Sequence, residues 1–257
     1  MIWAGVNKYL QIKMNDFKLA IANYRAEVSA LYPSSKTYCQ AYLTDETPDF
    51  SVAVTPSDID FEREKAARED ALEGLPVRNL PDALLEITAL QRKIAEELFS
   101  RNVLLFHGSV VAVDGAAYLF TAKSGTGKST HTRLWRQVFG DRAVMVNDDK
   151  PFLEITGDGV TVHGSPWNGK HRLGENISVP LRAVCILERG EENRINAIGA
   201  REALPMLLQH SQRPRDSRKL PLYLDLIDRL SSRVSFYRMQ CNMDPEAAVT
   251  AYKPMKP

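Results

Sequence analysis

The chain has 257 residues, of which 44% are hydrophobic and 25% are charged, and its net charge is +1. This length suits one large α/β domain, or a core with a small second domain. The balanced charge gives no reason to expect a nucleic acid or an anionic membrane surface as partner. No apolar run approaches the roughly 18 residues that cross a bilayer. The composition therefore favours a soluble globular protein without a membrane span.

The cysteines and the first residues bear on the compartment. Cys39, Cys185 and Cys241 lie far apart and match neither a zinc-ligand spacing nor a disulfide framework. The first residues lack the basic start and long apolar stretch of a signal peptide. We therefore expect a cytoplasmic protein in which the cysteines are small buried side chains.

The first hundred residues predict a small α+β unit. Three short β-prone runs alternate with turns: Phe17 to Ala22, Lys36 to Leu43 and Phe50 to Val54. A charge-rich helix is expected over residues 57–72, with Ser57 as its cap. A second helix over residues 81–100 has apolar side chains three or four positions apart, which is one face of a helix. We expect this helix to join an N-terminal unit, residues 1–100, to a core in residues 101–257.

The core predicts a mixed sheet. Residues 103–113 are β-prone, and Asp114-Gly115 is a hairpin turn into a buried strand over residues 116–121. A helix over 128–139 follows. The remaining expected strands are 143–146, 152–155, 160–163, 181–188 and 234–239, with helices around 200–210, 222–232 and after Pro245. The core combines hairpins with one clear strand–loop–helix unit, and strands and helices do not simply alternate. We therefore expect an α/β fold with a mixed sheet.

A phosphate-binding loop lies between the buried strand and the helix that follows it. The run from Ala122 to Ser129 reads Ala-Lys-Ser-Gly-Thr-Gly-Lys-Ser, with Ala122 where the consensus has its first glycine. Alanine disfavours positive φ, so the loop must begin with ordinary backbone angles. Its N–H groups and the helix N-terminus can surround an anion. The expected nucleotide-binding residues are Ser124, Gly125, Thr126, Gly127, Lys128, Ser129 and Thr130, with Lys128 on the β- and γ-phosphates and the Ser129 hydroxyl on Mg²⁺.

Two adjacent carboxylates complete the chemistry that phosphoryl transfer needs. Asp148 and Asp149 follow the strand that ends near Val146. One carboxylate can hold Mg²⁺ and the other can accept a hydroxyl proton. The alternative is an exposed turn, in which aspartate and asparagine are common.

Three further features are candidates for the site. His107, before Gly108, could hydrogen-bond a phosphate oxygen or be structural. The loop from Gly164 to Lys170 and beyond offers Trp167, Lys170 and Arg172 for an acceptor, or is a surface turn with the tryptophan packed inward. The basic stretch 213–219 could cover phosphates, although a solvated connector is the commoner case.

His107-Gly108, the loop and Asp148-Asp149, in this order, resemble the catalytic domain of HPr kinase/phosphorylase over roughly residues 102–190. The loop also resembles that of ATP-dependent phosphoenolpyruvate carboxykinase. The resemblance implies a phosphate-loop core of the HPr kinase C-terminal-domain type, ATP and Mg²⁺ as cofactors, and a homo-oligomer. It further implies that Asp148 is the general base, Asp149 a metal-site carboxylate and His107 an active-site histidine.

The chain also departs from that family. Thr130 stands where HPr kinases have glutamate, and the loop 164–170 replaces their glycine-rich signature. We therefore expect a divergent kinase that transfers the γ-phosphate of MgATP to a hydroxyl of a protein, peptide or small molecule other than HPr. The alternatives are a non-catalytic ATP-sensing regulatory protein and a plain NTPase.

Overall fold

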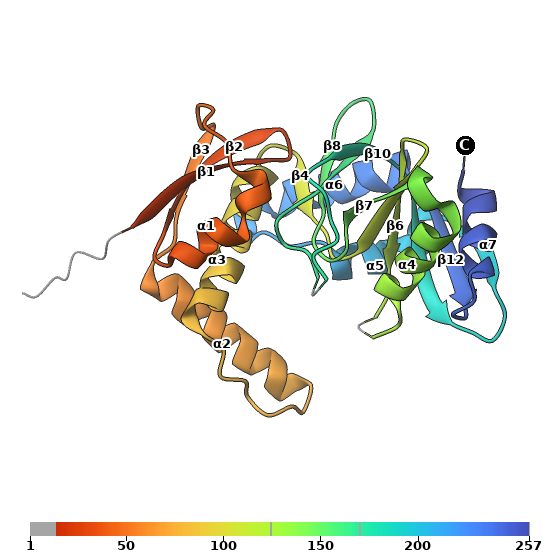
Figure 1. The fold of residues 1–257 in the computed structure, drawn as a ribbon, viewed down its shortest axis with the longest axis horizontal. Coiled ribbons are helices and arrows are strands. Elements are labelled where there is room, and N and C mark those ends of the chain that lie inside the picture. The colour runs from red at the N-terminus through yellow and green to blue at the C-terminus, as the bar shows by residue number, and fades with distance from the viewer. Residues whose placement is uncertain (1–13, 124, 170, 257) are drawn as a thin grey trace, which may run out of the picture. The chain divides into compact units, whose positions relative to one another are not determined.

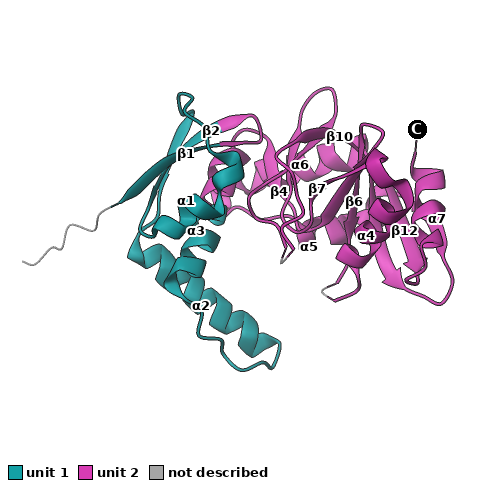
Figure 2. Ribbon diagram, viewed as in Figure 1, with its two compact units in different colours: residues 1–19, 25–92 teal, residues 20–24, 93–257 magenta. Residues whose placement is uncertain are grey.

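A computed structural model describes residues 14–123, 125–169 and 171–256. The chain divides into two compact units (Figure 2). The first contains the chain up to Leu19 and Arg25–Arg92, and the second contains Ala20–Tyr24 and the chain from Lys93 onward. The division falls within helix α3 (Asp82–Phe99). Among the described residues, no helix has the length and apolar character needed to cross a membrane.

The first unit is built around a three-stranded sheet in the order β1-β2-β3. Its strands are β1 (Asn15–Ile21), β2 (Tyr24–Ala30) and β3 (Phe50–Ala53), and its helices are α1 (Pro33–Tyr38), the short η1 (Gln40–Tyr42), α2 (Pro56–Leu72) and the first part of α3 (Figure 1). Strand β2 was not expected. The turn that precedes it holds Ala22 and Asn23 at positive φ, and alanine gives no sequence signal for such a hairpin turn.

The expected strand over Lys36 to Leu43 is wrong, because this segment is helical. Pro33 stands in the first turn of α1, where its missing N–H costs nothing. The buried Glu86 carboxylate accepts hydrogen bonds from Leu31 N (2.5 Å), Tyr32 N (3.0 Å) and Ser35 Oγ (2.6 Å). A distant side chain therefore organises the start of this helix.

The start of α2 also differs from the expectation. The cap is Thr55 and not Ser57, and Thr55 and Asp58 form a reciprocal capping box. Asp58 Oδ2 accepts a hydrogen bond from Thr55 N at 3.0 Å. Pro56 then occupies the first helical turn, as proline favours.

The second unit holds a nine-stranded sheet. The sheet is mixed, as the sequence predicted. Its strands are β4 (Val103–Leu105), β5 (Ser109–Val113), β6 (Ala116–Thr121), β7 (Ala143–Asn147), β8 (Phe152–Ile155), β9 (Val160–His163), β10 (Ser178–Arg189), β11 (Arg194–Ile198) and β12 (Ser235–Cys241). Its helices are α4 (Lys128–Phe139), α5 (Ala200–His210), α6 (Leu220–Arg233) and α7 (Glu246–Met255), with short 3₁₀ turns η2 (Gly140–Arg142) and η3 (Ser217–Lys219). The described chain thus has seven α-helices. Strand β11 was not anticipated.

The long strand β10 holds the sheet together. Its first residues pair antiparallel with β9, and the rest pair parallel with β6 on one side and with β12 on the other. Beyond β6 the order continues through β5 to β7. The β-prone run 103–113 becomes two strands, since β4 pairs with β8 and β5 pairs with β6 and β7. His107 and Gly108 lie in the gap between them.

Side chains alternate between the two faces of the sheet, and each face packs against helices. The second unit therefore has three layers, with the sheet in the middle. Tyr118 and Phe120 of β6 belong to the cluster that includes Trp135 of α4 and the alanines of α7. Leu119, between them, belongs to the cluster that includes residues of α5 and α6. Successive side chains of a strand point to opposite faces, so α4 and α7 cover one face of the sheet and α5 and α6 cover the other. Helices α4 and α7 lie side by side (Figure 1).

Candidate active site

Strand register brings three separate segments to one edge of the sheet. Val110 of β5 pairs with Leu119 of β6 on one side and with Asn147 of β7 on the other. Strands β6 and β7 therefore end at the same level, on either side of the segment His107–Gly108. The phosphate loop follows β6 and the aspartate pair follows β7, so the sheet itself makes them neighbours.

The loop connects β6 to α4 as its motif requires. Gly125 and Gly127 have φ of 74° and 121°, backbone angles that glycine alone adopts readily. Ala122 is buried and its φ is outside this left-handed region. The loop thus needs its two later glycines and tolerates alanine at its start. Ser124 lies outside the described residues.

Side chains also hold this loop. Lys128 Nζ donates a hydrogen bond to the carbonyl oxygen of Ala122 at 3.3 Å. Arg189, at the end of β10, donates from Nη2 to the carbonyl oxygen of Gly125 at 2.5 Å. Burial lowers the pKa of Lys128, and nearby Lys150 lowers it too, whereas Asp149 opposes the shift. Sequence reasoning missed Arg189, because strand pairing alone brings it to the loop.

The aspartate pair lies on a turn organised by Asn147. This buried side chain accepts hydrogen bonds at Oδ1 from Asp149 N (2.8 Å) and Lys150 N (2.6 Å). Its Nδ2 donates to Ser165 Oγ (3.0 Å), and Ser165 Oγ donates to Lys150 O (2.6 Å). The segment is therefore a fixed turn tied to the loop 164–170. An asparagine that precedes two aspartates at a strand end was an available signal, because asparagine often bonds the backbone two residues on.

Asp148 is held by a glycine. Its side chain is buried, and Oδ1 accepts a hydrogen bond from Gly169 N at 2.5 Å. A Cβ atom on residue 169 would lie 2.8 Å from Asp148 Oδ2, which is closer than carbon and oxygen approach without a bond. Within the described chain Oδ2 has no hydrogen-bond partner, so this oxygen is free to take a proton.

His107 and Asp149 are adjacent. Their Nε2 and Oδ1 atoms lie 3.3 Å apart, and both side chains are half-buried. Gly108 N donates to Asp149 O at 3.0 Å, and His107 N donates to His210 O at 2.7 Å. Burial, together with the charges of Lys150 and Lys128 and nearby His210, lowers the pKa of His107 to about 3. The imidazole is therefore neutral at physiological pH.

Burial raises the pKa of Asp149, and Asp148 raises it further. Lys150 and Lys128 oppose these effects. A cation beside the Asp149 carboxylate would therefore offset the cost of burying its negative charge. Asp149 and Ser129 both carry oxygen atoms, the ligand type that Mg²⁺ prefers. Among the described residues, three or more histidine, cysteine or acidic side chains nowhere gather as a metal-binding group.

The residues expected at an acceptor site do not lie together on one surface: one is buried, one is exposed and one is not described. Trp167 is buried and packs edge-on against Phe152, with ring centroids 6.2 Å apart. Its position matches the alternative of inward packing. Arg172 is exposed and has a φ of 48°, and Lys170 lies outside the described residues.

Cavities flank the loop. One, of about 520 Å³, is lined by loop residues Gly125 to Gly127 together with Thr130, Leu187 and Met243. Another, of about 550 Å³, is lined by Ser129, Arg133 and Arg136 together with Asp148 and His171. Both hollows border the loop or the first turn of α4, and of these two Asp148 lines only the second. Neither arginine was singled out from the sequence.

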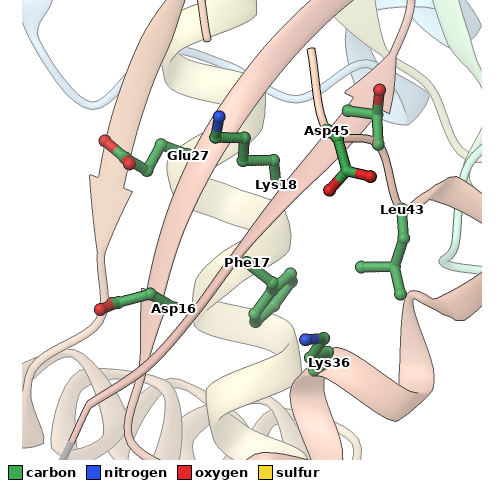
Figure 3. Close-up of a pocket in the computed structure, with 8 residues that line it drawn as sticks. Asp16, Phe17, Lys18, Glu27, Lys36, Leu43 and Asp45 are labelled. Atoms are coloured by element: carbon green, nitrogen blue, oxygen red, sulfur yellow. The ribbon is translucent and has the colours of Figure 1, made fainter. Parts of the chain in front are cut away.

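The first unit has its own surface hollow, of about 490 Å³, on its sheet and α1 (Figure 3). It is lined by lysines and acidic side chains beside Phe17 and Leu43. Figure 3 labels Lys18 and Lys36 together with Asp16, Glu27 and Asp45. This hollow contains both signs of charge and neither histidine nor cysteine.

Comparisons with known proteins identify the family. A family model described as "SynChlorMet cassette protein ScmC" matches residues 76–249. The chain belongs to this family. The match includes the phosphate loop, His107 and the aspartate pair, so these residues lie in the ScmC part of the chain.

Among solved structures, the HPr(Ser) kinase/phosphatase from Coxiella burnetii matches at 14% sequence identity. The alignment covers 49% of this chain and 88% of that chain, with a TM-score of 0.27. No curated protein matches the chain.

Proposed function

We propose that this ScmC-family protein is an ATP-dependent kinase that transfers the γ-phosphate of MgATP to a hydroxyl group. The observation that carries the proposal is that strand register brings Asp148 to the same sheet edge as Lys128 and Ser129. A nucleotide-binding loop alone is compatible with many activities. A carboxylate with a free oxygen beside that loop adds the base that hydroxyl phosphorylation requires.

Each residue then has a defined task. The loop N–H groups and Lys128 bind the phosphates, and Ser129 and Asp149 hold Mg²⁺, which neutralises phosphate charge when bound. Asp148 Oδ2 accepts the proton of the acceptor hydroxyl. The acceptor oxygen forms a bond to the γ-phosphorus as the bond from that phosphorus to the β–γ bridging oxygen breaks, and ADP leaves. Neutral His107 can donate one hydrogen bond to a phosphate oxygen.

Two of the hollows beside the loop suit the two substrates. The one lined by Leu187 and Met243 is apolar enough to accept the nucleoside. The one that Asp148 faces is the side on which the acceptor hydroxyl must lie. The same reasoning opposes a plain NTPase, because a cavity of about 550 Å³ beside the base is far larger than one water molecule needs.

The test is the Asp148→Asn variant. We expect it to lose phosphotransfer by about 10²–10⁴-fold, the usual contribution of a general base, while it still binds MgATP. Purified protein is incubated with γ-labelled ATP and fractionated extract of the source cells, and MgATP affinity is measured by calorimetry. Asp158→Asn, in the exposed β8–β9 turn, is the matched control.

The outcomes separate the candidate functions. Labelling of a product by the wild type and the control, but not by Asp148→Asn, supports the kinase. MgATP binding without any labelled product that depends on the protein would instead favour the ATP-sensing regulator. Undiminished labelling by Asp148→Asn would show that the assigned base is wrong.

A further inference from the structure

The hollow that Asp148 faces carries positive charge at some distance from the phosphate loop. Ser129, Arg133 and Arg136 line it from α4, at positions i, i+4 and i+7, which share one face of a helix. At 1.5 Å per residue, Arg136 lies about 10 Å along the helix from Ser129. The bound phosphates belong at the helix N-terminus. The two arginines are therefore one and two turns beyond the place where they would neutralise a nucleotide.

These arginines have no partners within the protein. In the described chain neither the Arg133 nor the Arg136 side chain forms a hydrogen bond, an ion pair or an aromatic contact, and both residues are exposed. Other arginines of the same unit are paired: Arg142, just after the same helix, bonds Asp114, and Arg238 bonds Glu188 and Glu202. Two unpaired guanidinium groups on one wall of a cavity are available for a ligand, and they suit a planar oxyanion such as a carboxylate.

The same hollow is also lined by a side chain of the reverse charge. Asp148 is a carboxylate that faces this space, so an anionic group next to it would be repelled. A ligand with an anionic group beside the arginines and a neutral hydroxyl beside Asp148 satisfies both kinds of lining residue. His171 also lines the hollow and its side chain has no hydrogen-bond partner within the described chain, so it can donate a further hydrogen bond.

We propose that the phosphate acceptor is a hydroxyl-bearing carboxylate, whose carboxylate binds Arg133 and Arg136 while its hydroxyl meets Asp148. This inference rests on the proposed kinase function and narrows its substrate class. The carboxylate belongs either to a small hydroxy acid or to an acidic residue beside a serine in a peptide. The shared chemistry is a carboxylate a few bonds from the hydroxyl.

The test measures binding, so it does not need the natural acceptor. Ligand-observed NMR titrations of the full chain use two matched pairs of probes, D-glycerate against glycerol and acetyl-Ser-Asp-amide against acetyl-Ser-Asn-amide. The variants are Arg133→Gln, Arg136→Gln and the double substitution. Arg201→Gln is the matched control, because Arg201 is an exposed residue of α5 whose side chain has no hydrogen bond or ion pair within the described chain. Thermal unfolding confirms that each variant is folded.

We expect at least one anionic probe to bind, its neutral counterpart to bind more weakly, and the double variant to lose about tenfold or more in affinity. Raised salt should weaken the wild-type binding, because exposed charges are screened. Binding of glycerate alone assigns the small hydroxy acid, and binding of the acidic peptide assigns the peptide.

Three results would overturn the inference: no anionic probe binds, the neutral probes bind as tightly, or the double variant binds like the control. A separate MgATP titration of the wild type keeps the two proposals distinct. Failure of MgATP binding refutes the kinase proposal, whereas MgATP binding without binding of either anionic probe refutes only the assignment of the acceptor.

Discussion

Single residues decide where the candidate base lies. Asp148 is buried, and one of its oxygens is held by the backbone of Gly169. Gly169 has no positive φ, so its importance lies in the space that a side chain would take. This is a role that sequence reasoning could not assign, because a glycine in a loop ordinarily indicates a turn.

Replacing Gly169 with alanine should therefore impair the proposed phosphotransfer. The added Cβ would lie 2.8 Å from Asp148 Oδ2 and 3.1 Å from its Cγ, so the carboxylate must move. A displacement of about 1 Å in a reacting group can cost about 100-fold in rate, and we expect a loss of this order in labelled-ATP assays. Gly157→Ala is the control, since a Cβ there meets nothing within 4 Å. Equal activity of the two variants would contradict the role of Gly169.

At the scale of elements, the strand–loop–helix unit was the most predictable part of the chain. A buried strand, a glycine-containing loop and a helix lie where the sequence placed them, because local pattern specifies all three. The residues around the loop that come from other elements were harder to predict from the sequence. Arg189 reaches the loop only through the pairing of β10 with β6, and His210 reaches His107 only through the position of α5. Sequence-local patterns do not encode such contacts.

The same unit explains why alanine begins the phosphate loop. Ala122 has ordinary backbone angles and its buried methyl group packs in the cluster with Trp135 and Phe120. Restoring the consensus with Ala122→Gly should lower the free energy of unfolding by roughly 1–2 kcal/mol, since it removes a buried methyl group and frees the unfolded backbone. We expect no gain in MgATP affinity. Urea unfolding and calorimetric titration measure the two quantities.

Gly127→Ala is the comparison for that variant. Residue 127 has a φ of 121°, so alanine strains the loop itself, and we expect MgATP affinity to fall. Tighter binding by Ala122→Gly, without loss of stability, would mean that the alanine is a defect of the loop and not a packed part of it.

At the scale of the whole molecule, the chain has two units with separate cores. Most helices and strands of the second unit followed from periodicity, although β11 and the division of residues 103–113 into β4 and β5 did not. Its mixed sheet was predicted. In the first unit the prediction failed for α1, where Glu86, more than fifty residues away, holds the start of the helix. In such segments a long-range contact, and not the local helix or strand propensity of the residues, determines the secondary structure.

Glu86 therefore offers a test of how far the first unit supports the phosphate loop. Glu86→Ala leaves the part-buried donors Leu31 N and Tyr32 N and the buried hydroxyl of Ser35 without their acceptor. Such a loss costs about 3 kcal/mol or more, so we expect the unfolding transition of the first unit to fall to a lower urea concentration. The loop and its neighbours belong wholly to the second unit, so MgATP affinity in the absence of urea should stay within about twofold of the wild type. Circular dichroism follows the first quantity and calorimetry the second. Loss of MgATP binding in a variant that is still folded would show that the first unit is needed for the nucleotide site.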